Sequence, residues 1–310
     1  MFTIGIVFLL PRPSWGATFL RQWSIKSGGL DLAPVGVTID NEGALYVTSA
    51  YGGLVFKYDQ QGVKLQEWGG RQGRPGDSSY PGRPDIGPDG NVYFSDANRV
   101  LVFTKDGTFV RAIGEVASGA SRIGLAEAVA VASDGTVMVC DPDNHRIVDL
   151  SPDGEFLRAW GVDGRASSQF QTPVAVDTDA AGNIIVLDQG TNTIYRFLWD
   201  RTPTSSWGGT GVSEGQFVRA TDFAIDADGK ILVTDSERHE VQVFDSSGDF
   251  LYKWGEPGTS AGQFDNPWGI AIDSSGQIYV ADCSNTRIQV FSPAVPVVPT
   301  SWTKLKLLGD

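Results

Sequence analysis

Histidine and cysteine are scarce in this sequence, which contains two of each among its 310 residues. A catalytic zinc ion normally takes three protein ligands, most often with histidine among them, and two histidines cannot supply a histidine-rich set. The sequence also contains no CxxC motif, no HExxH motif and no Walker loop. None of these common catalytic or nucleotide-binding machineries is therefore expected.

Basic residues are also in short supply, with 24 lysines and arginines against 37 acidic residues and a formal net charge of −13. Nucleic-acid binding depends mainly on lysine and arginine neutralising phosphates. We therefore expect no nucleic-acid partner, and the same charge disfavours an anionic membrane surface. A net negative charge of this kind commonly serves to keep a protein soluble.

Long apolar runs are absent apart from the first ten residues, MFTIGIVFLL, which are too few to span a bilayer. Small residues follow at Ser14 and Gly16, so residues 1–16 resemble a secretory signal peptide. No lysine or arginine precedes the apolar run, and a misassigned start codon or a first strand fits the same pattern. We expect a secreted or periplasmic protein without a transmembrane segment, with a cytoplasmic location as the alternative.

Glycine is abundant, and its spacing reveals a repeat. The chain has 38 glycines and a hydrophobic share of 41%, which is sufficient for a sizeable core. Stretches such as VASDGTVMV, IDADGKILV and IDSSGQIYV recur with one glycine in a tight turn. A near-constant period of this length indicates one supersecondary unit repeated along the chain. The turn glycines stand 47, 45, 47, 47 and 47 residues apart, at Gly43, Gly90, Gly135, Gly182, Gly229 and Gly276.

Each unit contains four short runs of alternating apolar residues separated by turns, as in WGIAID, QIYVAD, RIQVF and DFLYKWG. This pattern predicts a four-stranded antiparallel meander, and six meanders in a ring predict an all-β, six-bladed β-propeller over residues 17–292. The sixth unit lacks its fourth strand, because a proline-rich tail, 293–310, follows its third. FLRQWS at 19–24 is expected to supply that strand and close the ring, with PTSWT at 299–303 as the competitor.

The repeats resemble NHL repeats, on the evidence of DPDNHRIVDLSPDGEFLRAWG at 141–161 and GQFDNPWGIAIDSSGQIYVAD at 262–282. The resemblance extends from residue 19 to about residue 291 and implies a six-bladed propeller; WD40 repeats match less well. Propellers of this kind include protein-binding platforms, RNA-binding domains, extracellular sensor domains and metal-dependent lyases. Six-bladed lactonases hold a calcium ion in the channel, but their motifs are not found here.

Residues that recur in every unit are expected to be structural. One aspartate ends the second strand of five units and is expected to cap the following turn through backbone N–H groups. His145 and His239 occupy equivalent positions in units three and five, too far apart to meet. Cys140 and Cys283 fall in opposite blades, which excludes a disulfide between them. The recurring aspartates are Asp96, Asp141, Asp188, Asp235 and Asp282.

Function is expected where units depart from their consensus, and the start of the innermost strand departs most. Here Arg83, Glu127 and Asp222 place charge where other units have small or apolar residues, and Trp268 accompanies them. The preceding loops add Tyr80, Arg219 and Asp265. We expect these residues to converge near the axis as a ligand site. In the alternative interpretation the charges only neutralise one another, for example Arg83 with Glu127. Pro84 and Pro88 are expected to weaken the inner strand of the second unit.

The sequence favours a non-catalytic binding or scaffold module for a protein, peptide or glycan. The alternative is a hydrolase or lyase that uses a divalent cation such as calcium, held in the channel by carboxylates such as Glu127 and Asp222. No catalytic residue and no certain cofactor is assigned, and the oligomeric state is left open.

Overall fold

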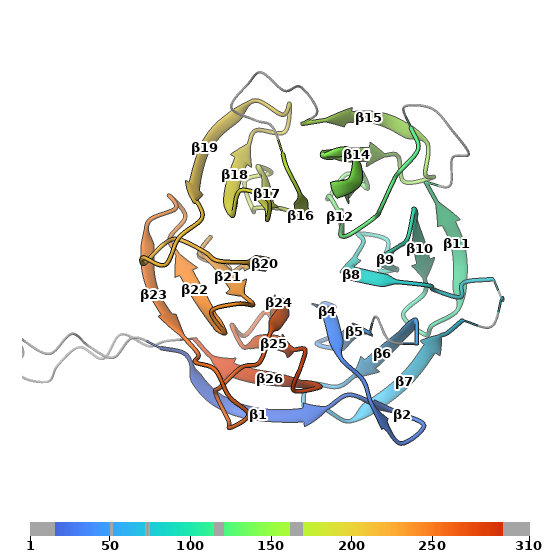
Figure 1. The fold of residues 1–310 in the computed structure, drawn as a ribbon. Helices are drawn as coiled ribbons and strands as arrows, with labels where there is room; N and C mark the ends of the chain where they lie inside the picture. The colour runs from blue at the N-terminus through green and yellow to red at the C-terminus, as the bar shows by residue number, and fades with distance from the viewer. Residues whose placement is uncertain are drawn as a thin grey trace, which may run out of the picture.

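The computed structural model describes residues 16–49, 52–71, 73, 75–114, 121–161 and 170–293. These residues form six four-stranded antiparallel sheets arranged as blades around a central axis. In Figure 1 the first strand of each blade lies nearest the axis and the fourth lies at the periphery. The all-β, six-bladed propeller expected from the glycine spacing is confirmed.

The first three blades follow one another along the chain. Blade one consists of β4 (Pro34–Ile39), β5 (Leu45–Ser49), β6 (Leu54–Tyr58) and β7 (Lys64–Gly69). Blade two consists of β8 (Pro81–Ile86), β9 (Val92–Asp96), β10 (Arg99–Phe103) and β11 (Phe109–Ile113). Blade three consists of β12 (Val129–Val131), β13 (Val137–Asp141), β14 (Arg146–Leu150) and β15 (Phe156–Trp160), with a single 3-10 turn, η1, at Pro142–Asn144.

The remaining blades complete the ring. Blade four consists of β16 (Pro173–Thr178), β17 (Ile184–Asp188), β18 (Thr193–Phe197) and β19 (Pro203–Gly208). Blade five consists of β20 (Ala220–Ile225), β21 (Ile231–Asp235), β22 (Glu240–Phe244) and β23 (Phe250–Trp254). Blade six consists of β24 (Pro267–Ile272), β25 (Ile278–Asp282), β26 (Arg287–Ser292) and β1 (Thr18–Ser24). A short hairpin, β2 (Lys26–Ser27) with β3 (Leu30–Asp31), connects β1 to blade one.

The N-terminal strand closes the ring, as the incomplete sixth repeat predicts. Strand β1 pairs antiparallel with β26 from Thr18 opposite Ser292 to Ser24 opposite Arg287. This pairing completes blade six with the N-terminal strand through main-chain hydrogen bonds and removes an open sheet edge. The competing segment, 299–303, lies outside the described residues. So do residues 1–15 of the expected signal peptide and 294–310 of the expected tail.

The core lies between neighbouring blades rather than within any one of them. One cluster combines Val47 and Phe56 of blade one with Tyr279 and Ile288 of blade six, and all four side chains are fully buried. Tryptophans of the fourth strands add to this contact. The indole of Trp23 lies on Gly62 of the next blade, where a Cβ would come within 2.4 Å of the ring. Each blade is therefore stable only against its neighbours, which explains why the ring has to close.

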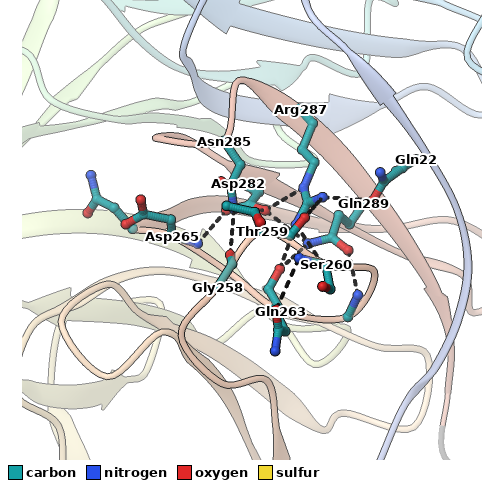
Figure 2. Close-up of polar contacts among 12 residues, drawn as sticks. Gln22, Gly258, Thr259, Ser260, Gln263, Asp265, Asp282, Asn285, Arg287 and Gln289 are labelled. Carbon is teal, nitrogen blue, oxygen red and sulfur yellow. Dashed lines mark hydrogen bonds and ion pairs between the residues drawn. The ribbon is translucent and has the colours of Figure 1, made fainter.

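The recurring aspartates are structural, although they mainly cap a different segment from the one expected. Asp282, for example, accepts a hydrogen bond from the backbone N–H of Asp265, in the loop that leads into its own blade (Figure 2). Its carboxylate also accepts from Arg287 Nε at 2.7 Å and from Gln289 Nε2 at 2.9 Å. Arg287 in turn donates to Gln22 Oε1 of β1. This network ties the closing strand to the sixth blade.

The inner strand of blade two keeps a length of six residues with Pro84 inside it, and its expected weakening by Pro84 and Pro88 stays a prediction. Strand β8 spans six residues and accommodates Pro84 at a register shift between Pro81 and Pro84. The strand is the inner edge of its sheet, where a missing N–H interrupts no ladder on the axial side. The shortest of the six inner strands is instead β12.

The cysteines lie as the repeat predicts. Cys140 is buried on β13 of blade three and Cys283 follows β25 of blade six, and both are free thiols. Among the described residues, no helix is long and apolar enough to cross a membrane.

Candidate functional site

Five of the seven predicted site residues surround one cavity at the axis of the ring, and Asp222 and Asp265 do not line it. The cavity has a volume of about 490 Å³ and is lined by Tyr80, Arg83, Glu127, Arg219 and Trp268. They come from the starts of the inner strands of blades two, three, five and six. We call this space the mouth cavity. Because inner strands converge on the axis, residues far apart in the sequence meet there.

Arg83 crosses the channel below the mouth cavity. Its Nη1 lies 2.9 Å from Asp222 Oδ1 on β20, and it also donates to the carbonyl oxygen of Val174 at 2.7 Å. Arg83 and Asp222 are only 9% and 7% exposed. The ion pair thus joins blades two and five, on opposite sides of the ring (Figure 1). The alternative interpretation, in which the charges neutralise one another, holds for Arg83 and Asp222, whereas its example of Arg83 with Glu127 is wrong because the guanidinium extends to Asp222.

Asp222 is held on both of its oxygens. Oδ1 accepts the backbone N–H of Phe223 at 2.8 Å, and Oδ2 accepts that of Ile270 in blade six at 3.0 Å. Burial raises the pKa of Asp222 to about 6, against the opposing effects of Arg83 and these backbone bonds. Both oxygens of its carboxylate are therefore bonded within the protein. The residue lies in the channel wall rather than in the mouth cavity.

A second chamber of about 160 Å³ lies along the channel and shares Arg83 with the mouth cavity. Asp85 and Asp177 both line it, and sequence reasoning missed them. Burial raises the pKa of both carboxyls, and the charge of Asp85 raises that of Asp177 further. Their signal lay five residues before the turn glycine, where the other units have only threonine or alanine: Thr38, Ala130, Ala224 and Ala271.

Glu127 differs from the other axial carboxylates. Its side chain makes no hydrogen bond or ion pair with any residue that the structure describes, although its backbone carbonyl accepts from Ser95 Oγ at 2.9 Å. Burial raises the pKa of Glu127, and the charges of Arg83 and Arg219 oppose that rise. The carboxyl group lines the mouth cavity without a protein donor.

The rim of the mouth cavity is aromatic and polar. The guanidinium of Arg219 lies 6.0 Å from the ring centre of Trp268 and 3.8 Å from Glu237. Trp268 Nε1 donates to Asn266 at 3.0 Å, which fixes the indole. Tyr80 is 43% exposed.

Loops that follow the second strands contribute residues that the sequence did not single out as a site. Asp143, His145 and Gln189 all line the mouth cavity. Nδ1 of His145 hydrogen-bonds to the carbonyl oxygen of Gln171. The other histidine, His239, accepts the backbone N–H of Asn266 at 3.1 Å. Each histidine contacts the next blade, and the two do not form one site.

The axial carboxylates do not fit a divalent cation. In the described part of the chain no three histidine, cysteine or acidic side chains are grouped to hold a metal ion. Asp222 and Asp85 use both oxygens for bonds within the protein, since Asp85 accepts from Ile86 and Val131. Calcium requires six to eight oxygen ligands. The divalent cation of the alternative hydrolase or lyase function therefore has no ligand set among the described residues.

The sequence GTSAG at 258–262 matches the GxSxG pattern of a serine nucleophile, which the sequence analysis did not single out. It lies in the loop between β23 and β24, and no helix follows it. The carbonyl oxygen of Ser260 accepts from Arg287 in the network of Figure 2. The segment is part of the structural network of blade six.

The fold and the site define a six-bladed β-propeller with an axial cavity. The NHL repeat profile matches residues 217–244 and 264–291, which hold the three inner strands of blades five and six. The chain therefore contains NHL repeats within a six-bladed propeller. A comparison with curated proteins gave no match.

Solved structures of similar fold include enzymes and a protein of unknown function. Virginiamycin B lyase from Staphylococcus aureus is 14% identical with a TM-score of 0.61, over 88% of this chain and 99% of that one. A gluconolactonase from Xanthomonas campestris is 14% identical with a TM-score of 0.66, over 92% and 99%. A protein of unknown function from Bacteroides thetaiotaomicron is 14% identical with a TM-score of 0.67, over 91% and 75%. At these identities the likeness shows the fold alone.

Proposed function

We propose that this protein is a non-catalytic binding module that recognises a protein, peptide or glycan at the mouth cavity. The observation that carries the proposal is the convergence of unrepeated side chains from several blades on one cavity. Its volume of about 490 Å³ is that of a ligand pocket. Aromatic rings at the rim and charged groups at the base supply contact area and orientation.

The test is ligand capture with wild-type protein and a Trp268→Ala variant on peptide and glycan arrays. Loss of the indole should weaken any ligand bound in the mouth cavity by at least tenfold, since an aromatic anchor contributes about 2 kcal/mol or more. Trp199→Ala is the matched control, because this tryptophan is 37% exposed and does not line the cavity. Equal capture by wild type and Trp268→Ala would contradict the proposed site.

The alternative function is a metal-dependent hydrolase or lyase with a carboxylate-lined channel. It rests on the enzymes among proteins of similar fold, since the channel carboxylates Asp85 and Asp177 do not form a ligand set for a metal ion among the described residues. Thermal unfolding after chelation, and then with calcium, zinc, magnesium or manganese, separates the two functions. A ligand at a hundred times its dissociation constant adds about 2.7 kcal/mol of stability. A shift of a few degrees with one metal would favour the alternative.

We also propose that the protein is exported, on the basis of the apolar run and small residues within 1–16. Mass spectrometry of the full-length product made in a secreting host tests this. A mature N-terminus near residue 17 is expected, and an intact chain retained inside the cell would contradict export.

A further inference from the structure

Four carboxyl groups stand along the axis of the ring, and one of them is paired with the channel arginine. Arg83 is satisfied by Asp222 and by the carbonyl oxygen of Val174. A ligand group that enters from the mouth meets Glu127, whose carboxyl group has no ion pair or hydrogen bond among the described residues. The four carboxylates are Asp85, Glu127, Asp177 and Asp222.

Glu127 is the carboxylate that a ligand reaches from the mouth cavity. The Glu127 side chain is only partly exposed and has no protein donor, so its carboxylate oxygens are available to a ligand. Asp143, exposed on the same cavity, also has no side-chain partner among the described residues, whereas the rim cation Arg219 already contacts Trp268 and Glu237. These carboxylates can accept N–H groups from a ligand.

We propose that the mouth cavity binds a ligand carrying a protonated amine, which donates its N–H groups to the carboxylate of Glu127. The proposal rests on the binding function and specifies its ligand chemistry. The alkyl portion next to the amine would contact Trp268 and Tyr80 at the rim. An anionic head group in the same position would face the axial carboxylates, and a quaternary ammonium group would bring no N–H donor to Glu127.

The experiment is titration calorimetry of the full chain with small probes of matched shape. Nα-acetyl-lysine methylamide presents a side-chain amine, and its Nε-acetylated form is the neutral control. A glycine-initiated tripeptide with a free amino terminus and glucosamine distinguish an α-amine and an amino sugar as sources of the same chemistry. At least one amine probe should bind tenfold or more tightly than its N-acetylated counterpart.

The protein side of the test compares Glu127→Gln with Glu237→Gln. Both changes remove one acidic charge, but Glu237 contacts Arg219 at the rim and does not line the cavity. Glu127→Gln should lower amine affinity by tenfold or more, the loss expected for one charge-assisted hydrogen bond. Glu237→Gln should change it less than threefold. The probe comparison on wild-type protein holds even if Glu127→Gln fails to fold.

The outcomes separate the two proposals. If the neutral probes bind as well as the amines and Trp268→Ala abolishes both, the binding site stands and amine recognition is wrong. If no amine probe binds but a peptide or glycan array gives a ligand sensitive to Trp268→Ala, amine recognition is again overturned and the proposed function survives. If no probe and no array ligand responds to Trp268→Ala, both proposals fail.

Discussion

Two kinds of buried Asp–Arg pair in this propeller look alike locally and differ in their place in the repeat. Asp282 and Arg287 lie 2.7 Å apart within blade six, and blade three has the equivalent pair of Asp141 and Arg146 at 2.8 Å. The pair of Arg83 and Asp222, at 2.9 Å, joins opposite blades and has no counterpart. The repeated pair holds one blade together, whereas the unrepeated pair crosses a channel.

This difference shows how a repeat protein divides its charged residues between scaffold and site. A pair that recurs in phase with the repeat satisfies backbone and side-chain groups that every blade has. A pair that occurs only once lies at the axis, where residues from different blades meet. Substitutions in the repeated pairs should therefore affect the scaffold, and substitutions in the unrepeated pair should affect the site at the axis.

Deleting residues 1–24 should have the largest effect, because it removes β1 from blade six. The deletion uncovers the edge of β26 and removes the contact of Trp23 with Gly62. We expect loss of cooperative unfolding, measured by circular dichroism during urea titration. Deletion of 294–310 is the control and should leave the transition in place, since the described strands already complete all six blades. Equal loss in both deletions would show that the N-terminal strand alone does not close the ring.

Ring closure is one of the features that could be predicted from the sequence. The six turn glycines and the missing fourth strand predicted the fold and its closure, because both are local patterns that repeat. The partner of Arg83 could not be predicted, since it depends on which side chains meet across the channel. Asp85 and Asp177 do carry a signal in the sequence, because they are charged residues at a position of the inner strand where the other units have threonine or alanine.

Asp282→Ala tests the repeated pair and should destabilise the protein strongly. Asp282 is fully buried, and its removal leaves the guanidinium of Arg287 without its anion and weakens the contact to β1. Removing one partner of a buried pair costs about 3–5 kcal/mol. Urea unfolding should show a midpoint well below that of wild type. A loss under about 1 kcal/mol would contradict the structural role of the network.

Arg83→Met tests the unrepeated pair. It should lower the free energy of unfolding by about 1–2 kcal/mol at neutral pH, less than Asp282→Ala does. Asp222 can take up a proton once its cation is gone, because burial already raises its pKa to about 6. The double variant Arg83→Met, Asp222→Leu should recover part of the loss, and a double-mutant cycle by urea unfolding measures the coupling. Additive losses would mean that the two side chains do not interact across the channel.

Asp177→Asn should have the smallest effect on stability and the opposite sign. Burial and the charge of Asp85 raise the pKa of Asp177 above its value in the unfolded chain. The folded state then binds more protons than the unfolded state between about pH 4 and pH 7, so this carboxyl lowers stability as the pH rises through that range.

Asparagine removes the penalty and can still accept the N–H of Thr178. We expect a gain of roughly 1 kcal/mol at pH 8 and none at pH 4, less than the full effect of the raised pKa because the amide of asparagine also has to be buried. Asp228→Asn is the control, because it removes an exposed carboxylate that Lys230 holds at 2.6 Å, and it should not stabilise the protein at any pH. Urea unfolding from pH 4 to pH 8 measures both variants. Parallel curves for wild type and Asp177→Asn would show that this channel carboxyl has no raised pKa. A gain confined to high pH would show that the unrepeated axial charges lower stability, which is the cost expected of residues kept for a site rather than for the scaffold.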